Sequence, residues 1–523
     1  MPFKKPVIGA QCVIQTGFAP QQWDTLHSVI SAQTGIQLLD INVLFEQFQA
    51  VITLIGEPGS MLNALLTTAN FMNEWIDSEH PLNLWCLLYS VSGIMEDELQ
   101  AYQKILGTNL VTHLQANVFQ VPERTWMQSV VDFKAIPSDW IQLKTPEAQS
   151  KSDADTSMPT ALNVLLCQGK PHLFWHIGTN TDSLKSLETI IDELDQSLDT
   201  DAEGTYFVYP IWRDEKQAGE LVIEFDYSQC YLYEIFISAQ KSLLAHKMNW
   251  IGSEFVGVCN RDLLLNLAER IRFEQKSFRI ASEKEDIDLA VQTLGLARYG
   301  QFDDNQLFEN HYYRYIQSLR QSGLTEFGES LSRSHQAPGG GSAAAYTASM
   351  GASLILMVIN STLYSKKYES LHTQYYQYGL KIRVANRLLV ESIDLDAEAL
   401  TILLKNSKLF RSEDPELKEK KKSIVRQACL IPLEVIKICS ALVELISQIV
   451  GDCNPSAITD LGVAARMIEA AAQSSYYNII INLNFDTEGH EISLKEEADN
   501  LLTFIHKVFF DIEQVLFERI SPS

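Results

Sequence analysis

Ala337-Pro338-Gly339-Gly340-Gly341-Ser342 opens a long run of small and apolar residues in the last third of the chain. Three consecutive glycines allow the backbone to adopt positive φ angles or to approach a ligand closely, and Ser342 stands where a helix N-cap is expected. The free N–H groups and the positive dipole end of such a helix favour an anion. The stretch therefore predicts a helix of small residues whose start, from Pro338 to Ser342, binds an anionic ligand. The alternative is a plain loop before a buried helix.

The chain after this stretch has a helical pattern to its end. From about residue 310 onward, long amphipathic segments dominate, and Gly and Pro occur mainly at the breaks between them. We therefore expect an all-α domain over residues 306–523, built as a helical bundle.

The first 300 residues alternate short, apolar, β-rich segments with helical ones, which is the pattern of α/β layered domains. Strands are expected near residues 7–14 and 84–89. A polar and charged stretch at residues 144–160 separates a first α/β domain, residues 1–150, from a second, residues 151–305. The expected fold class is thus two α/β layered domains followed by an all-α bundle, in a chain of 523 residues.

The composition excludes some classes of function. A net charge of −25 argues against nucleic-acid binding, which usually needs a basic surface. The eight cysteines form no Cys-x-x-Cys pair and no Cys/His cluster with zinc spacing, so we expect buried thiols, a reducing compartment and no metal. No signal-peptide pattern follows Met1, and the longest apolar runs, such as residues 350–359, are shorter than the about 20 residues of a membrane span. The sequence predicts a cytoplasmic protein that binds neither nucleic acid nor a membrane.

A helix over residues 382–404 would place one acidic side chain on its apolar face. At 100° per residue, the apolar stripe includes Ile393 and Leu400, and Asp396 lies between them. Asp394 does not share that face, because residues i and i+2 do not face each other, and we expect it in solvent. A carboxylate on an apolar stripe must be paired, hydrogen-bonded or protonated, and burial raises its pKa toward the range of a general acid. Asp396 is therefore a candidate acid, and the alternative is a cap or salt bridge inside the bundle.

Several segments of the C-terminal region resemble the formiminotransferase-cyclodeaminases, which handle formimino groups on folate. One of them is Asp394-Leu395-Asp396-Ala397-Glu398-Ala399, which is similar to the family's Asp-x-Asp-Ala-Glu-Ala. The resembling segments are, in chain order, residues 337–342, 357–358, 362–367, 394–399, 431–433, 454–465 and 478–483. Their common order makes the resemblance specific, although each motif alone is short.

The resemblance implies a cyclodeaminase reaction on a tetrahydrofolate derivative. N10 of 5-formiminotetrahydrofolate attacks the amidine carbon on N5, ammonia leaves, and 5,10-methenyltetrahydrofolate forms. The resemblance makes Asp396 the proton donor and the turn from Pro338 to Ser342 the folate contact. Asp460, at an expected helix start, is first a cap and second a substrate contact. No metal is implied, the number of glutamates on the folate stays open, and the family's dimers and larger rings imply a homodimer or larger homo-oligomer.

The first 300 residues resemble a formiminotransferase that has lost polar residues. Glu79-His80-Pro81 keeps the family's frame, and His80 stands at the position of the family's catalytic histidine. Leu82, Leu84 and Leu87 replace the Arg, Gly and Asp that follow this motif in the family. We therefore expect the transferase activity to be lost or weakened, with His80 as a relic of it.

Two other functions fit the same residues. A methenyltetrahydrofolate cyclohydrolase would use the same fold and folate contact, and the release of ammonia distinguishes the two reactions. A non-catalytic folate-binding or assembly protein is the alternative from a different class. The presence of Asp396 and of the glycine turn argues against it, while the changed first half shows that such losses occur in this chain.

Overall fold

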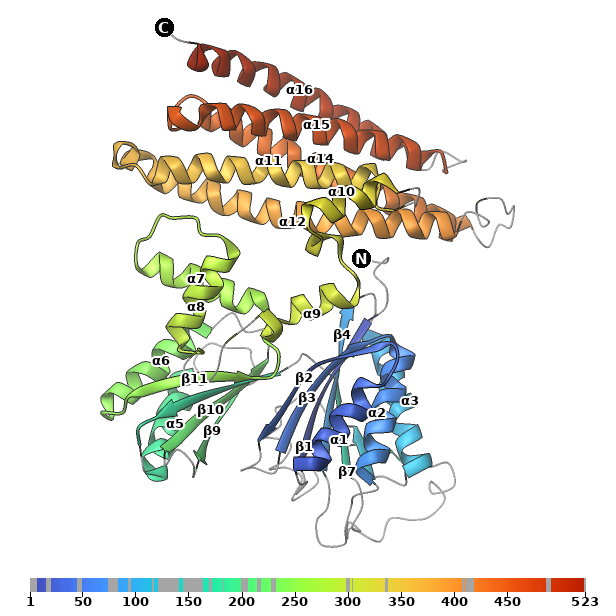
Figure 1. The fold of residues 1–523 in the computed structure, drawn as a ribbon, viewed down its shortest axis with the longest axis vertical. Helices are drawn as coiled ribbons and strands as arrows, with labels where there is room; N and C mark the ends of the chain where they lie inside the picture. Colours follow the sequence, from blue (N-terminus) through green and yellow to red (C-terminus); the bar gives the residue numbers. More distant parts are fainter. Residues whose placement is uncertain are drawn as a thin grey trace. The chain divides into compact units, whose positions relative to one another are not determined.

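A computed structural model shows a chain of two compact units (Figure 1). The α/β unit comprises Lys5–Glu274 and Ser282–Ile316, and the helical unit comprises Met1–Lys4, Gln275–Ala281 and Gln317–Ser523. The structure describes residues 7–15, 20–44, 49–73, 83–92, 96–114, 117–120, 141–143, 163–168, 172–181, 183–198, 206–213, 218–226, 232–297, 302, 304–333, 337–406, 410, 418–485 and 491–521. The predicted fold class, α/β followed by all-α, is confirmed.

A mixed seven-stranded sheet forms the first part of the α/β unit, with the strand order β2-β3-β1-β4-β7-β5-β6. Its strands are β1 (Val7–Gln15), β2 (Ile36–Leu44), β3 (Gln49–Gly56), β4 (Asn83–Ser92), β5 (Asn117–Gln120), β6 (Ile141–Leu143) and β7 (Asn163–Gln168). Three helices supply the other half of its core: α1 (Pro20–Ser31), α2 (Pro58–Asn73) and α3 (Glu96–Leu114). Alternate residues of β1, such as Ile8, Ala10 and Cys12, enter this core because successive side chains of a strand point to opposite faces.

Both predicted domain boundaries differ from the pairing that the structure shows. β7 follows the boundary at residue 150, yet it pairs in parallel with β4 and β5 of the first sheet. The helix α9 (Phe308–Tyr315) follows the boundary at residue 305, yet it belongs to the α/β unit. In α9, Phe308 and Tyr312 pack against a small apolar cluster around Val258. Sequence patterns mark elements, whereas these long-range pairings decide to which unit an element belongs.

A four-stranded antiparallel sheet forms the second part, with the order β11-β8-β10-β9. Its strands are β8 (His172–Thr179), β9 (Tyr206–Arg213), β10 (Ala218–Asp226) and β11 (Trp250–Val256). Its helices are α5 (Leu184–Leu198), α6 (Leu232–Ala245), α7 (Arg261–Glu274) and α8 (Glu283–Leu294). Trp175, Leu221 and Ile223 point from the sheet into the core that these helices cover. The other face of the sheet therefore carries the alternate residues.

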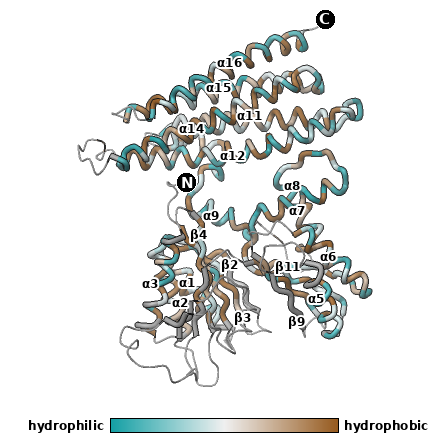
Figure 2. Tube along the Cα trace, turned by 180° about the vertical axis from the view of Figure 1, so that it is seen from behind, coloured by the Kyte–Doolittle hydropathy of each residue, from teal (hydrophilic) through white to brown (hydrophobic). Residues whose placement is uncertain are grey.

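Long helices build the helical unit. They are α10 (Leu324–Ser332), α11 (Gly340–Leu363), α12 (His372–Lys405), α14 (Lys418–Ile449), α15 (Ile458–Leu483) and α16 (Ile492–Ile520). The hydropathy colouring in Figure 2 alternates along α12 and α16, as expected for helices that bury one face. Their buried residues join one apolar core that extends through α11, α12, α14, α15 and α16.

The small residues of α11 place it in the middle of this core. A Cβ added at Gly351 would lie 2.9 Å from Cδ1 of Ile468 and 3.2 Å from the carbonyl oxygen of Ala464, so α15 packs directly on the α11 backbone. By length and composition α11 would be able to cross a membrane, but 56% of its most apolar window is buried inside the unit. This burial is typical of a core helix, since such helices pass the same test.

Candidate active site at the start of α11

The glycine turn starts α11 three residues earlier than the sequence predicted. Gly339, with φ −136° and ψ −157°, is the N-cap residue, and its carbonyl oxygen accepts the N–H of Ala343 at 3.1 Å. The prediction that Ser342 is the N-cap is therefore wrong. Ser342 lies inside the first turn, fully buried, and its hydroxyl donates to the carbonyl oxygen of Ile393 in α12 at 2.9 Å. The close backbone approach allowed by glycine occurs here, but at negative φ.

Asp396 of α12 takes the place of the missing cap. Its carboxylate accepts a hydrogen bond from the backbone N–H of Ser342, and the Ser342 hydroxyl lies 3.3 Å from Asp396 Oδ2. A Cβ added at Gly341 would lie 1.9 Å from Asp396 Oδ1, which is far inside van der Waals contact. Only glycine therefore fits between the first turn of α11 and this carboxyl group. The capping alternative considered for Asp396 describes its contacts correctly.

The same contacts leave Asp396 suited to proton transfer. Burial raises the pKa of its carboxyl group to about 6, and the two hydrogen bonds from Ser342 oppose this rise only in part. A carboxyl group with a pKa of about 6 is partly protonated near neutral pH, as a general acid requires. A cap and an acid are thus compatible roles for this one side chain.

Asp394 has a structural position, contrary to the prediction that it lies in solvent. Its carboxylate accepts hydrogen bonds from the hydroxyl of Ser318 at 2.5 Å, the N–H of Leu319 at 2.6 Å and Nε of Arg320 at 2.7 Å. The Asp394 side chain is 14% exposed. A short 3₁₀ helix (Leu319–Gln321) packs over this face of α12, and the periodicity of α12 alone did not predict that cover.

Replacing Asp394 by Asn should therefore lower stability and spare the chemistry. The loss of charge weakens hydrogen bonds to an ionised group, each worth about 1.5–3 kcal/mol, so we expect the free energy of unfolding to fall by about 2 kcal/mol. Urea unfolding followed by circular dichroism measures this change. Unchanged stability in this variant would contradict the structural role of the Asp394 carboxylate.

Asn478 of α15 is a candidate site residue that the sequence analysis did not single out. A Cβ added at Gly340 would lie 3.8 Å from Asn478 Oδ1, so the amide faces the glycine turn. Its Nδ2 donates to the carbonyl oxygen of Ser474 at 2.9 Å, one turn earlier in α15, which fixes the side chain. The signal for this residue was the resemblance of residues 478–483, which names a segment but no role.

Asp460, another predicted site residue, does not join this group. Asp460 lies in the first turn of α15, but the N-cap residue of that helix is Ala457. Asn454, just before it, donates its N–H to Thr362 near the other end of α11. Twenty residues separate Ser342 from Thr362, about 30 Å along a helix, so within one chain Asp460 is far from the glycine turn. His80 lies outside the residues that the structure describes.

Comparisons with known proteins find family matches in two regions of the chain. A family model described as formiminotransferase-cyclodeaminase matches residues 323–499, and one described as formiminotransferase domain matches residues 211–313. The formimidoyltransferase-cyclodeaminase of Rattus norvegicus is 24% identical over 493 residues, covering 89% of this chain and 90% of the relative. That of Gallus gallus is 25% identical over 527 residues, covering 92% of both chains.

Two shorter proteins are similar to part of this chain. The methenyltetrahydrofolate cyclohydrolase of Methylorubrum extorquens is 30% identical over 162 residues, covering 30% of this chain and 78% of the relative. The crystal structure of formiminotetrahydrofolate cyclodeaminase from Thermotoga maritima is 22% identical and covers 39% of this chain and all of that one, with a TM-score of 0.36. From the two family models and the full-length relatives, this chain belongs to the bifunctional formiminotransferase-cyclodeaminase family.

Proposed function

We propose that the helical unit is a cyclodeaminase that converts 5-formiminotetrahydrofolate to 5,10-methenyltetrahydrofolate and ammonia. The observation that carries this proposal is the carboxyl group of Asp396, buried against Gly341 with a pKa raised to about 6. Attack of N10 on the amidine carbon is an intramolecular reaction, so the enzyme must hold the folate in one orientation and protonate the departing nitrogen. The departing imine nitrogen gains two protons, one that N10 loses on attack and one from Asp396, and leaves as ammonia.

The remaining residues of the turn divide into two groups. Pro338 and Gly339 are partly buried and Gly340 is exposed, so their backbone is accessible to the folate. Ser342 is fully buried and bonded to Ile393 and Asp396, so we assign it to the positioning of the acid rather than to substrate contact. Asn478, beside Gly340, is the further polar group that a folate bound at the turn would meet.

The test is the formation of methenyltetrahydrofolate from chemically prepared 5-formiminotetrahydrofolate, with ammonia measured in parallel. The proposal requires equal amounts of both products from the wild-type chain. If the chain instead hydrolyses methenyltetrahydrofolate and releases no ammonia, the result supports the second candidate, a cyclohydrolase. That candidate is supported by the 30% identity to the Methylorubrum enzyme over 162 residues. Absence of both reactions in a folded protein that binds folate would favour the non-catalytic alternative.

We further propose that the transferase activity of the α/β unit is lost or weakened. The support is the replacement of polar residues after His80 by Leu82, Leu84 and Leu87, which removes charges that would hold glutamate and folate. The test offers formiminoglutamate and tetrahydrofolate to the Asp396→Asn variant, in which 5-formiminotetrahydrofolate would accumulate. Accumulation at the rate of an active transferase would overturn this part of the proposal.

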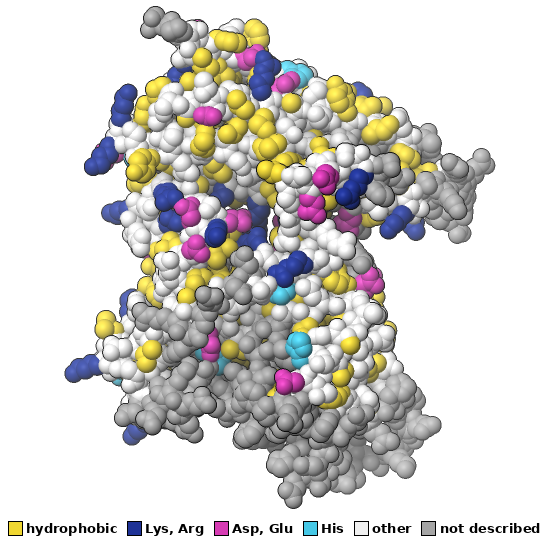
Figure 3. Space-filling view, in the orientation of Figure 1, with side chains coloured by type: hydrophobic (Ala, Val, Ile, Leu, Met, Phe, Trp, Pro, Cys, Tyr) yellow, Lys and Arg dark blue, Asp and Glu magenta, His cyan; other side chains and the backbone are white. Residues whose placement is uncertain are grey.

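We propose a homo-oligomer assembled through the helical unit, acting in the cytoplasm. The buried free thiols among the described residues, such as Cys429 and Cys439, fit a reducing compartment. Hydrophobic side chains are exposed over the long helices (Figure 3). A groove between α15 and α16 is lined by apolar side chains that include Val463, Leu516 and Phe517, and Phe517 is 65% exposed. Exposed apolar patches of this kind typically mark protein–protein interfaces.

Replacing Phe517 by Glu should weaken self-association without unfolding the unit. An interface residue of this size contributes about 2 kcal/mol when it is central, so we expect the dissociation constant to rise about 30-fold. Sedimentation velocity over a range of protein concentrations measures this dissociation constant. Leu324→Glu, at a leucine of α10 that is 75% exposed, is the matched control and should leave association unchanged.

A further inference from the structure

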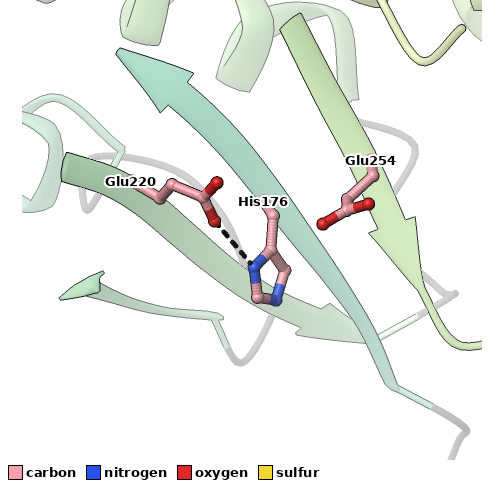
Figure 4. A group of neighbouring side chains, drawn as sticks. All are labelled: His176, Glu220 and Glu254. Atoms are coloured by element: carbon pink, nitrogen blue, oxygen red, sulfur yellow. Dashed lines mark hydrogen bonds and ion pairs between the residues drawn. The ribbon is translucent and has the colours of Figure 1, made fainter. Parts of the chain in front are cut away.

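Three strands of the second sheet bring one histidine and two glutamates together (Figure 4). His176 lies on β8, Glu220 on β10 and Glu254 on β11. Their ligand atoms all lie within 4.8 Å of one another, and Nδ1 of His176 is 3.4 Å from Oε2 of Glu220. The cluster belongs to the α/β unit and shares no residue with the site at the start of α11.

The strand register explains why these side chains converge. His176 is directly opposite Glu254 on β11 and opposite Val222 on β10, and Glu220 is two residues from Val222, so all three side chains leave the same face. Their neighbours Trp175 and Ile177 point to the helix-covered face. The cluster is therefore held by three paired strands, which fix its backbone more firmly than loops do.

The distance between His176 and Glu220 matches that between two ligands of one metal ion. Two ligands of a tetrahedral ion with bonds of about 2.1 Å are separated by about 3.4 Å, which is the distance between His176 Nδ1 and Glu220 Oε2. A charge-assisted hydrogen bond between the same groups would be about 2.7–2.9 Å long. The ligand atom of Glu254 lies within 4.8 Å of those of the other two residues.

Burial and charge favour a divalent ion at this place. His176 and Glu220 are each 1% exposed, and Glu254 is partly buried. The two glutamates favour a cation over an anion, and buried ionisable groups in proteins are normally paired or coordinate metals. Imidazole nitrogen together with carboxylate oxygen is a donor set suited to Zn²⁺.

We propose that His176, Glu220 and Glu254 bind one Zn²⁺ ion, with a fourth position open to water or a ligand. Three protein ligands and one open position are the arrangement of catalytic rather than structural zinc sites. The sequence analysis found no metal site because the ligands are 44 and 34 positions apart, on strands that only the sheet brings together. The competing account is an imidazolium that shares its proton with the two carboxylates.

Titration of the full-length, chelator-treated chain with Co²⁺, a spectroscopic substitute for Zn²⁺, tests the proposal. One equivalent should bind with the visible absorption of a four-coordinate ion, and Zn²⁺ should displace it. In His176→Gln and in Glu254→Gln the affinity should fall more than about 10-fold. Glu254 is partly exposed, so Glu254→Gln keeps the test informative if His176→Gln does not fold.

His246→Gln is the matched control, because His246 and Glu193 form an exposed pair at 2.8 Å in the same unit. This variant should bind Co²⁺ as the wild type does. The absence of stoichiometric binding by the folded wild-type chain would overturn the proposal in favour of the shared proton. Binding that survives both ligand substitutions would also overturn it. Neither outcome depends on the cyclodeaminase activity of the helical unit.

Discussion

Replacing Asp396 by Asn is expected to lower kcat for methenyltetrahydrofolate formation by about 100- to 10,000-fold, the usual contribution of a positioned general acid. The amide oxygen of Asn can still accept the N–H of Ser342, so the start of α11 keeps its cap. The variant should therefore fold. Its activity is measured by the appearance of the methenyl chromophore and of ammonia, and its fold by circular dichroism. A variant that turns over at the wild-type rate would exclude Asp396 as the acid.

The pH dependence gives a second readout for the same residue. The carboxyl of Asp396 has an ordinary pKa of 3.8, and its pKa in the folded chain is about 6. Its acid form is depleted above that value, so wild-type kcat/KM should decrease as the pH rises above about 6, if substrate groups do not titrate there. A profile that stays flat up to pH 8 would contradict the assigned role.

Stability should respond to pH in the same range. Between pH 3.8 and about 6 the folded chain binds more protons at Asp396 than the unfolded chain does, so the free energy of unfolding falls as the pH rises. The contribution is fully present below pH 3.8 and is lost above about 6. The free energy of unfolding of the wild type, compared with that of Asp396→Asn, should thus fall by about 1–3 kcal/mol across this window. Denaturant titrations of both chains at pH 4 and pH 7.5 measure this difference.

Replacing Gly341 by Ala is expected to have nearly as large an effect on turnover. The added Cβ would lie 1.9 Å from Asp396 Oδ1, so the carboxyl group must leave its position or α11 must shift. Misplacing a catalytic group by about 1 Å costs about 100-fold in rate, and overpacking of this kind costs about 1–3 kcal/mol of stability. Steady-state kinetics and urea unfolding measure the two effects.

Two other glycines separate this clash from the general effect of an added methyl group. Gly340→Ala, in the same turn, meets only Asn478 at 3.8 Å and should keep its stability. Gly328→Ala, inside α10, meets no described atom within 4 Å and should keep both stability and activity. If Gly341→Ala behaves like Gly328→Ala, the carboxyl of Asp396 does not occupy the position described here.

The sequence predicted the elements well and the contacts between them less well. Periodicity was sufficient for strands β1 and β4 and for the apolar face of α12, on which Asp396 lies. It did not predict the partners of Asp394, since these come from a 3₁₀ helix 75 residues away along the chain. Ser342 was misjudged for a related reason, because local capping rules do not foresee that a neighbouring helix supplies the cap.

The position of β7 shows the same limit at the scale of domains. A polar stretch at residues 144–160 is a reasonable linker signal, yet β7 after it returns to the first sheet. His176, Glu220 and Glu254 are likewise unremarkable in the sequence and meet only through the register of three strands. Non-local pairing is decided by the whole chain, so a one-dimensional pattern carries little information about it.

The start of α11 also determines what happens after Asp396 has given up its proton. The carboxylate that remains faces the N–H of Ser342 at the positive end of a 24-residue helix. The N–H and the dipole favour the carboxylate, but burial disfavours it more, so proton donation weakens the junction between α11 and α12. Each turnover thus ends in the less stable of two states, and the uptake of a proton restores that junction before the next folate reacts.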